Sequence, residues 1–159
     1  MAFWRFVLAM FLSYLPGILG VIVTPMTGGG NAWYNTLNRS LLTPPGWVFS
    51  ATWTVLYFMI GLALFFVMQT NFANSGQIKT NAYTLFAINL IFNTLWSFAF
   101  FGAQMPEVAL LILTALIITV ILMARAFFKI NPVSFWLILP YILWLFFAFY
   151  LNGMIIYLN

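Results

Sequence analysis

Cysteine and histidine are absent from this sequence of 159 residues, and Glu107 is its only acidic residue. Without cysteine there is no disulfide bond, and without both residue types the usual ligands of zinc, iron–sulfur clusters and haem iron are missing. One carboxylate cannot supply the acid pair of general acid–base catalysis or a multi-carboxylate proton relay. We therefore expect no metal site, no resident cofactor and no conventional catalytic site.

Charge of either sign is scarce. Charged residues make up 4% of the chain, against 65% hydrophobic residues, whereas soluble domains carry about 25% charged residues. Six charges cannot cover a surface that faces water, so the composition predicts an integral membrane protein. The five basic residues are too few for a patch that follows nucleic-acid phosphates. The partner that this composition predicts is the lipid bilayer, and nucleic acid is not expected.

Five segments have the roughly 20 apolar residues that a bilayer-crossing helix needs. Because backbone hydrogen bonds must be closed within each segment in lipid, we expect helices. The prediction is an all-α integral membrane protein with one transmembrane domain, residues 1–159, and a long loop between the first and second helices. The expected helices cover about residues 3–23, 47–69, 80–101, 107–128 and 133–158.

Three proline positions mark expected helix starts. Thr43–Pro44 is typical of an N-cap followed by a first-turn proline at the start of the second helix, and Asn131–Pro132 of the same arrangement in the fifth. Pro106–Glu107 would begin the fourth helix and place the only carboxylate at the positive end of its dipole.

An odd number of spans puts the two termini on opposite sides of the membrane. Four basic residues then lie on or near the N-terminal side, against Arg39 alone on the loop side; they are Arg5, Lys79, Arg125 and Lys129. The positive-inside rule predicts a cytoplasmic N-terminus and an external loop. A bacterial cell membrane suits such a helical bundle best.

Aromatic, amide and small residues from four helices fall at similar depths beneath the long loop. With a rise of about 1.5 Å per residue, Trp53, Asn93 and Trp96 lie roughly 8 to 12 Å below the loop face, and Trp144 and Ala148 roughly 14 to 20 Å below it. The first helix adds Pro16, Gly17 and Gly20. These residues therefore gather in one half of the bilayer.

Helical spacing also predicts which faces these residues share. An unpaired amide that faces lipid costs several kcal/mol, so we expect the asparagines to point inward. The fourth span is nearly featureless and is expected to face lipid or another subunit. Three stripes, each a set of residues on one face of one helix, follow this spacing: Ser50, Trp53, Thr54 and Tyr57; Asn89, Asn93, Trp96 and Phe100; and Tyr141, Trp144 and Ala148.

Two interpretations of these stripes remain open. Membrane asparagines can simply join helices through hydrogen bonds, and the deep tryptophans can belong to a closed core. Alternatively, the stripes line a pocket for a flat, hydrophobic aromatic ligand with one or two polar groups. Arg39 could meet a ligand carboxylate at the rim or remain a solvated loop residue. Four tryptophans at span ends are expected to be interfacial anchors, namely Trp4, Trp33, Trp47 and Trp136.

Three blocks resemble a known family. "WYNTLNRSLLTPPGWVF", "NLIFNTLWSFAFFG" and "PYILWLFFAFYLN" are similar to the signature blocks of the translocator protein family, TspO/MBR, also called tryptophan-rich sensory proteins or peripheral benzodiazepine receptors. The resemblance implies a five-helix bundle, usually a homodimer, that binds protoporphyrin IX and benzodiazepine-type ligands under the first loop. It places Tyr34, Pro44, Trp53, Asn93, Trp144 and Ala148 in the pocket.

The stripes add Asn89, Trp96 and Tyr141 to this set of ligand-binding candidates. The resemblance further implies that Trp53 and Trp144 take part in light-dependent porphyrin degradation, which makes them the catalytic candidates.

Two departures from the family pattern stand out. Arg39-Ser40-Leu41-Leu42 replaces the usual Lys-Pro-x-Trp, so the lid keeps a cation but loses a proline and an aromatic ring. Tyr157 is followed by no basic residue, so we do not expect the C-terminal sterol motif of the animal proteins.

The sequence is compatible with four functions: a receptor or sensor for porphyrin-like ligands, a tryptophan-dependent photo-oxidative activity, a transporter of tetrapyrroles or other lipophilic molecules, and a structural scaffold. Two small-xxx-small pairs could join subunits or pack within one chain, namely Ser13 with Gly17 and Ala99 with Ala103.

Overall fold

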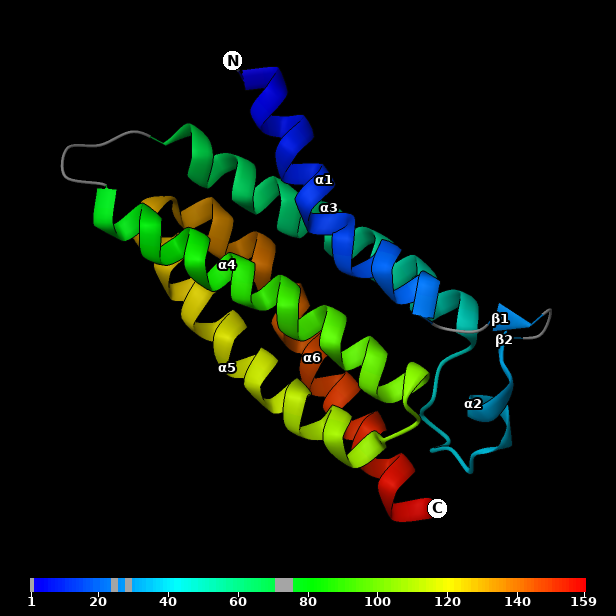
Figure 1. Ribbon diagram of the computed structural model, residues 1–159. Helices are drawn as coiled ribbons and strands as arrows, with labels where there is room; N and C mark the ends of the chain where they lie inside the picture. Colours follow the sequence, from blue (N-terminus) through cyan, green and yellow to red (C-terminus); the bar gives the residue numbers. More distant parts are fainter. Residues whose placement is uncertain (1, 24–25, 28–29, 71–75) are drawn as a thin grey trace.

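Five long helices lie side by side in the computed structural model, which describes residues 2–23, 26–27, 30–70 and 76–159 (Figure 1). All five are long and apolar enough to cross a membrane. The predicted all-α class is confirmed. Among the described residues, the one β-structure is a pair of antiparallel strands in the first loop, each two residues long. The long helices are α1 (Ala2–Val23), α3 (Gly46–Gln69), α4 (Gly76–Ser97), α5 (Pro106–Ile130) and α6 (Pro132–Leu158).

The helices form a closed ring in which α1 contacts α3, α3 contacts α6, α6 contacts α5, α5 contacts α4 and α4 returns to α1. The loop between α1 and α3 contains β1 (Met26–Thr27), β2 (Gly30–Asn31) and the short helix α2 (Ala32–Thr36). Figure 1 shows α2, the strands and the C-terminus at one end of the bundle, and the N-terminus at the other. Residues under this loop therefore come from the ends of several helices.

Two of the three predicted helix starts are confirmed. The Asn131 side chain accepts a hydrogen bond from the Val133 N–H at 3.0 Å, and Pro106 occupies the first turn of α5 beside Glu107. The predicted start at Thr43–Pro44 is wrong, because α3 begins at Gly46 after Pro45, with no side-chain cap. Thr43 and Pro44 each precede a proline, which disfavours helical backbone angles, so the helix forms only after the second proline.

The third span starts a turn earlier than expected, at Gly76 instead of about residue 80. Polar side chains form this turn: Gln77 donates to Asn81 at 2.9 Å, and the Thr80 hydroxyl donates to the Gly76 carbonyl at 3.0 Å. Because these residues are polar, an apolar run does not reveal them.

At its other end α4 widens into a π-helical turn, η1 (Phe98–Gly102). Ala103 N–H bonds the Phe98 carbonyl, five residues back, at 2.7 Å. Gln104 then adopts a positive φ of 58° and ends the helix. Such π-turns interrupt the regular helical repeat and are frequent at functional sites, and here both Phe100 and Phe101 face the same cavity.

Glycines allow α1 and α3 to approach closely. A Cβ atom at Gly17 would lie 2.7 Å from the Tyr57 ring, and one at Gly61 would lie 2.7 Å from the Ser13 hydroxyl. The Ser13–Gly17 pair therefore packs within the chain. At the opposite end of these helices, Arg5 donates to the Met68 carbonyl and to the Gln69 side chain, both at 3.1 Å.

The helix α5 has two different faces. One face is buried against α4 and α6, and the other exposes large apolar residues, including Leu111, Ile118 and Leu122. The expectation that this span faces lipid or another subunit therefore applies to its outer face alone.

Candidate functional site

A cavity of about 600 Å³ lies beneath the first loop. This volume is within the range of about 300 to 1,000 Å³ that is typical of small-molecule sites. Its walls come from α1, α3, α4, η1 and α6, while none of the described lining residues belongs to α5. The principal lining residues are Tyr14, Pro16, Gly17, Gly20, Tyr34, Asn35, Arg39, Pro44, Phe49, Ser50, Trp53, Thr54, Tyr57, Asn93, Trp96, Ser97, Phe100, Phe101, Ala148, Leu151, Asn152 and Ile155.

The short helix α2, with Trp33 and Tyr34, forms the roof of the cavity, and aromatic contacts hold it in place. The Tyr34 ring lies 6.1 Å from Phe100 and 5.8 Å from Phe101, centroid to centroid. Trp33 packs edge-on against Phe100 at 5.7 Å. Trp33 therefore packs within the roof, and its role as an interfacial anchor stays a prediction. The other three predicted anchors, Trp4, Trp47 and Trp136, are exposed.

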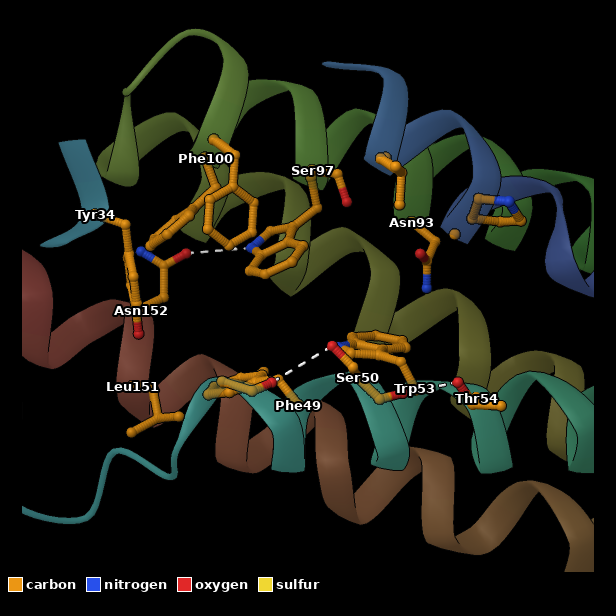
Figure 2. Close-up of a pocket in the computed structure, with 18 of the residues that line it drawn as sticks. Tyr34, Phe49, Ser50, Trp53, Thr54, Asn93, Ser97, Phe100, Leu151 and Asn152 are labelled. Carbon is orange, nitrogen blue, oxygen red and sulfur yellow. Dashed lines mark hydrogen bonds between the residues drawn. The ribbon is translucent and has the colours of Figure 1, made fainter. Parts of the chain in front are cut away.

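Two walls face each other across the cavity. Figure 2 shows Phe49, Ser50 and Trp53 of α3 on one side and Asn93, Ser97 and Phe100 on the other. The hydroxyls of Ser50 and Thr54 donate to carbonyls one turn back in α3, at 3.4 and 2.8 Å. Because these hydroxyl protons are used internally, the α3 wall offers mainly aromatic surface.

Stacked rings extend both walls. Trp53 stacks on Tyr57 with centroids 5.3 Å apart and an interplanar angle of 29°. On the other side Trp96 stacks on Phe100 at 5.4 Å and 20°. Each pair presents a rigid aromatic edge or face at low conformational cost, which suits a flat apolar ligand.

A chain of three hydrogen bonds closes the floor. The Tyr57 hydroxyl donates to Asn93 Oδ1 at 3.1 Å, Asn93 Nδ2 donates to the Tyr141 hydroxyl at 2.8 Å, and that hydroxyl donates to Asn89 Oδ1 at 2.9 Å. Both asparagines point inward, as expected. The chain joins α3, α4 and α6 and compensates for the burial of these polar groups.

We expect Asn93→Leu to lower the free energy of unfolding by about 1–3 kcal/mol. Leucine has a similar volume but removes two bonds of the chain, leaving the Tyr57 hydroxyl without its acceptor. Reversible unfolding in mixed detergent micelles measures the change. Asn81→Leu is the control, because Asn81 is an exposed residue near the start of α4. Equal stability of the two variants would contradict a structural role for the chain.

Comparison with known proteins identifies the family of this chain. Residues 9–158 match the TspO/MBR family. This chain belongs to the TspO/MBR family. The family resemblance predicted from the sequence is confirmed, and this TspO/MBR protein is an integral membrane protein of a sensor and translocator family.

Relatives of this TspO/MBR chain come from archaea, bacteria and mammals. Tryptophan-rich protein TspO of Archaeoglobus fulgidus is 38% identical over 154 residues, covering 93% of this chain and 97% of its own. The tryptophan-rich sensory protein of Cereibacter sphaeroides is 35% identical over 141 residues, covering 86% and 82%. The translocator protein of Homo sapiens is 29% identical over 127 residues, covering 79% and 73%.

Six of the nine predicted ligand-binding residues of the TspO/MBR chain line the cavity. They are Tyr34, Pro44, Trp53, Asn93, Trp96 and Ala148. Asn89 and Tyr141 lie behind Asn93 in the floor, and Tyr141 is completely buried. These two residues support the cavity without lining it.

Trp144 also lies outside the lining. It packs edge-on against Trp53 at 6.5 Å and against Phe49 at 5.5 Å, and it borders an outer groove between α3 and α6. Among the described residues, no acceptor bonds its buried Nε1. The helix α6 is therefore rotated relative to the prediction. The residues that it presents to the cavity have the spacing i, i+3, i+4, i+7 and are Ala148, Leu151, Asn152 and Ile155.

Asn152 is a lining residue that the sequence stripes missed. Its Oδ1 accepts from Trp96 Nε1 at 3.3 Å, the dashed line from Asn152 in Figure 2. Its Nδ2 donates to the Pro106 carbonyl at 2.9 Å. The side chain therefore holds the Trp96 ring and ties α6 to the start of α5. The spacing of four residues from Ala148 was the available signal.

Proposed function

We propose that this TspO/MBR protein is a membrane receptor or sensor whose cavity binds flat, largely apolar aromatic molecules. Protoporphyrin IX is the porphyrin to test, and benzodiazepine-type compounds are a second ligand class. The observation that carries this proposal is the 600 Å³ cavity with stacked aromatic walls and a packed roof. The names of the relatives, tryptophan-rich sensory protein and translocator protein, are consistent with it.

Several lining polar groups are already occupied by intramolecular bonds. Asn93 and Tyr57 bond each other, and Asn152 bonds Trp96 and Pro106. A ligand would therefore gain most of its binding free energy from apolar burial and from contacts with aromatic rings, and little from new hydrogen bonds to the floor. A large, flat, conjugated ring system meets this condition.

Titration of purified protein with protoporphyrin IX in the dark tests the proposal. Trp53 and Trp96 line the cavity, so bound porphyrin is expected to quench tryptophan fluorescence with saturation at one porphyrin per chain. Empty micelles with a free tryptophan analogue control for partition into detergent. Quenching that rises linearly without saturation would contradict binding in the cavity.

A photo-oxidative activity is the second candidate function, and the position of Trp53 favours it. The indole lines the cavity, stacks on Tyr57 and contacts Trp144 edge-on. A light-excited porphyrin would take one electron from this indole, so the indole is oxidised and the porphyrin reduced. Dissolved O₂ would accept that electron from the reduced porphyrin, and the reduced oxygen species formed would be the oxidant that net degradation of the macrocycle requires.

Transport of lipophilic molecules is an alternative that the packing supports less well. Beyond the floor, the interior is filled by large buried side chains, including Leu64, Met123, Phe127 and Ile138. Passage along the bundle would require these residues to move. A flux assay in vesicles distinguishes a transporter from a receptor.

We also propose a homodimer in a bacterial cell membrane with the N-terminus in the cytoplasm. The exposed apolar face of α5 and the exposed Ala103 beyond α4 remain available to a second copy. Light scattering in detergent measures the subunit number. Accessibility of a single cysteine placed in the first loop measures the orientation.

A further inference from the structure

Arg39 is the only charged residue among those that line the cavity in the described part of the chain. It lies on the loop between α2 and α3, at the mouth of the cavity, and its side chain is exposed. We propose that Arg39 is an anchor for a ligand carboxylate, and that the cavity therefore selects amphipathic aromatic acids, which enter ring-first. The inference rests on the proposed ligand-binding function of the cavity.

The guanidinium is held in a position suited to this role. Its Cζ lies 5.0 Å above the Tyr34 ring centroid, a cation–π contact with the roof. A guanidinium carries five N–H donors in one plane, and contact with a single ring leaves donors for other partners. Those donors can form the paired hydrogen bonds that arginine makes with a carboxylate.

Both neighbours of Arg39 are tied to the C-terminal part of α6, one to its C-cap residue Asn159 and one to Tyr150. The Asn38 N–H donates to Asn159 Oδ1 at 2.9 Å, and Asn159 Nδ2 donates back to the Asn38 carbonyl at 3.0 Å. The hydroxyls of Ser40 and Tyr150 share a hydrogen bond of 3.0 Å. Because the same helix lines the cavity with Leu151 and Ile155, these bonds fix the Arg39 backbone relative to the site.

Electrostatics then determines how the ligand is oriented. The one carboxyl side chain of the protein, Glu107, is on the first turn of α5, which does not contribute to the described lining. A ligand carboxylate pushed toward the floor would lose its water and meet no opposite charge, which strongly disfavours that orientation. At the mouth it keeps solvent contact and gains a charge-assisted bond with Arg39.

Protoporphyrin IX and its dimethyl ester provide the test, because they share one ring system and differ in charge. For the unmodified protein at pH 7, we expect the acid to bind about tenfold more tightly than the ester. Arg39→Gln is expected to remove this preference by weakening acid binding while ester binding stays within about twofold. Lys129→Gln is the control, because it removes a cation from the last turn of α5, outside the cavity lining. This variant should keep the preference for the acid.

Asn159→Ala tests the positioning of the arginine. It is expected to reduce the ratio of acid to ester affinity and to leave ester affinity unchanged, whereas general damage to the fold would weaken both. Equal affinities of the unmodified protein for acid and ester, or equal weakening of both by Arg39→Gln, would overturn the anchor while the ligand-binding cavity stands. Saturable binding of neither probe would overturn the porphyrin-binding function and the anchor together.

Discussion

Ala148→Leu is expected to weaken protoporphyrin IX binding by about 10- to 100-fold. Ala148 lines the cavity on α6 and is 6% exposed, so a larger side chain there projects into the space for the ligand. A rigid macrocycle cannot adjust to the added branched carbons, and overpacking costs about 1–3 kcal/mol. The dark fluorescence titration measures the change.

A matched substitution separates blocked space from general damage. Ala51→Leu makes the same change on α3, at an exposed position that borders the outer groove between α3 and α6. This variant should bind porphyrin with unchanged affinity. If both leucine variants bind as tightly as the unmodified protein, porphyrin does not occupy the cavity beneath the loop.

Trp53→Phe is expected to slow the photobleaching of bound porphyrin by about tenfold or more. Phenylalanine keeps an aromatic ring in the wall but is much harder to oxidise than indole, so the excited porphyrin loses Trp53 as an electron donor. Loss of part of the stacked surface should raise the dark Kd by only about two- to tenfold. The porphyrin absorption band, followed under constant light at saturating protein, reports the rate.

Trp144→Phe distinguishes the roles of the two tryptophans. Trp144 contacts Trp53 edge-on at 6.5 Å but lies outside the lining, so its replacement should slow bleaching less than replacement of Trp53. Trp136→Phe, at an exposed position on α6, should leave the rate unchanged. Unchanged bleaching in the Trp53 variant would show that the indole is not the electron donor.

Composition and spacing predicted much of this cavity. The scarcity of charge predicted a membrane protein, and helical spacing placed Ser50, Trp53, Thr54 and Tyr57 on one face of α3, all of which line the site. These inferences hold because lipid enforces helices and because residues three and four apart share a helix face. The inward direction of Asn89 and Asn93 follows from the cost of exposing amides to lipid.

Other features depend on how helices are rotated and where the chain leaves regular geometry. The stripe through Tyr141, Trp144 and Ala148 has nearly the correct spacing, yet α6 turns only Ala148 of these three to the cavity. Neighbouring helices set that rotation through their combined packing, which no single segment encodes. The π-turn contains both Phe100 and Phe101, which line the same cavity. It breaks the 3.6-residue repeat on which the predicted stripes rely.

By itself, the sequence determined that this protein lies in a bilayer as five helices, since sparse charge and long apolar runs have no other stable arrangement in water or lipid. Tertiary structure alone decided that Asn38 meets Asn159 across 121 positions of the chain, and that Trp144 lies behind Trp53. Local propensity acts over one helical turn, whereas these contacts arise from the packing of whole helices against one another.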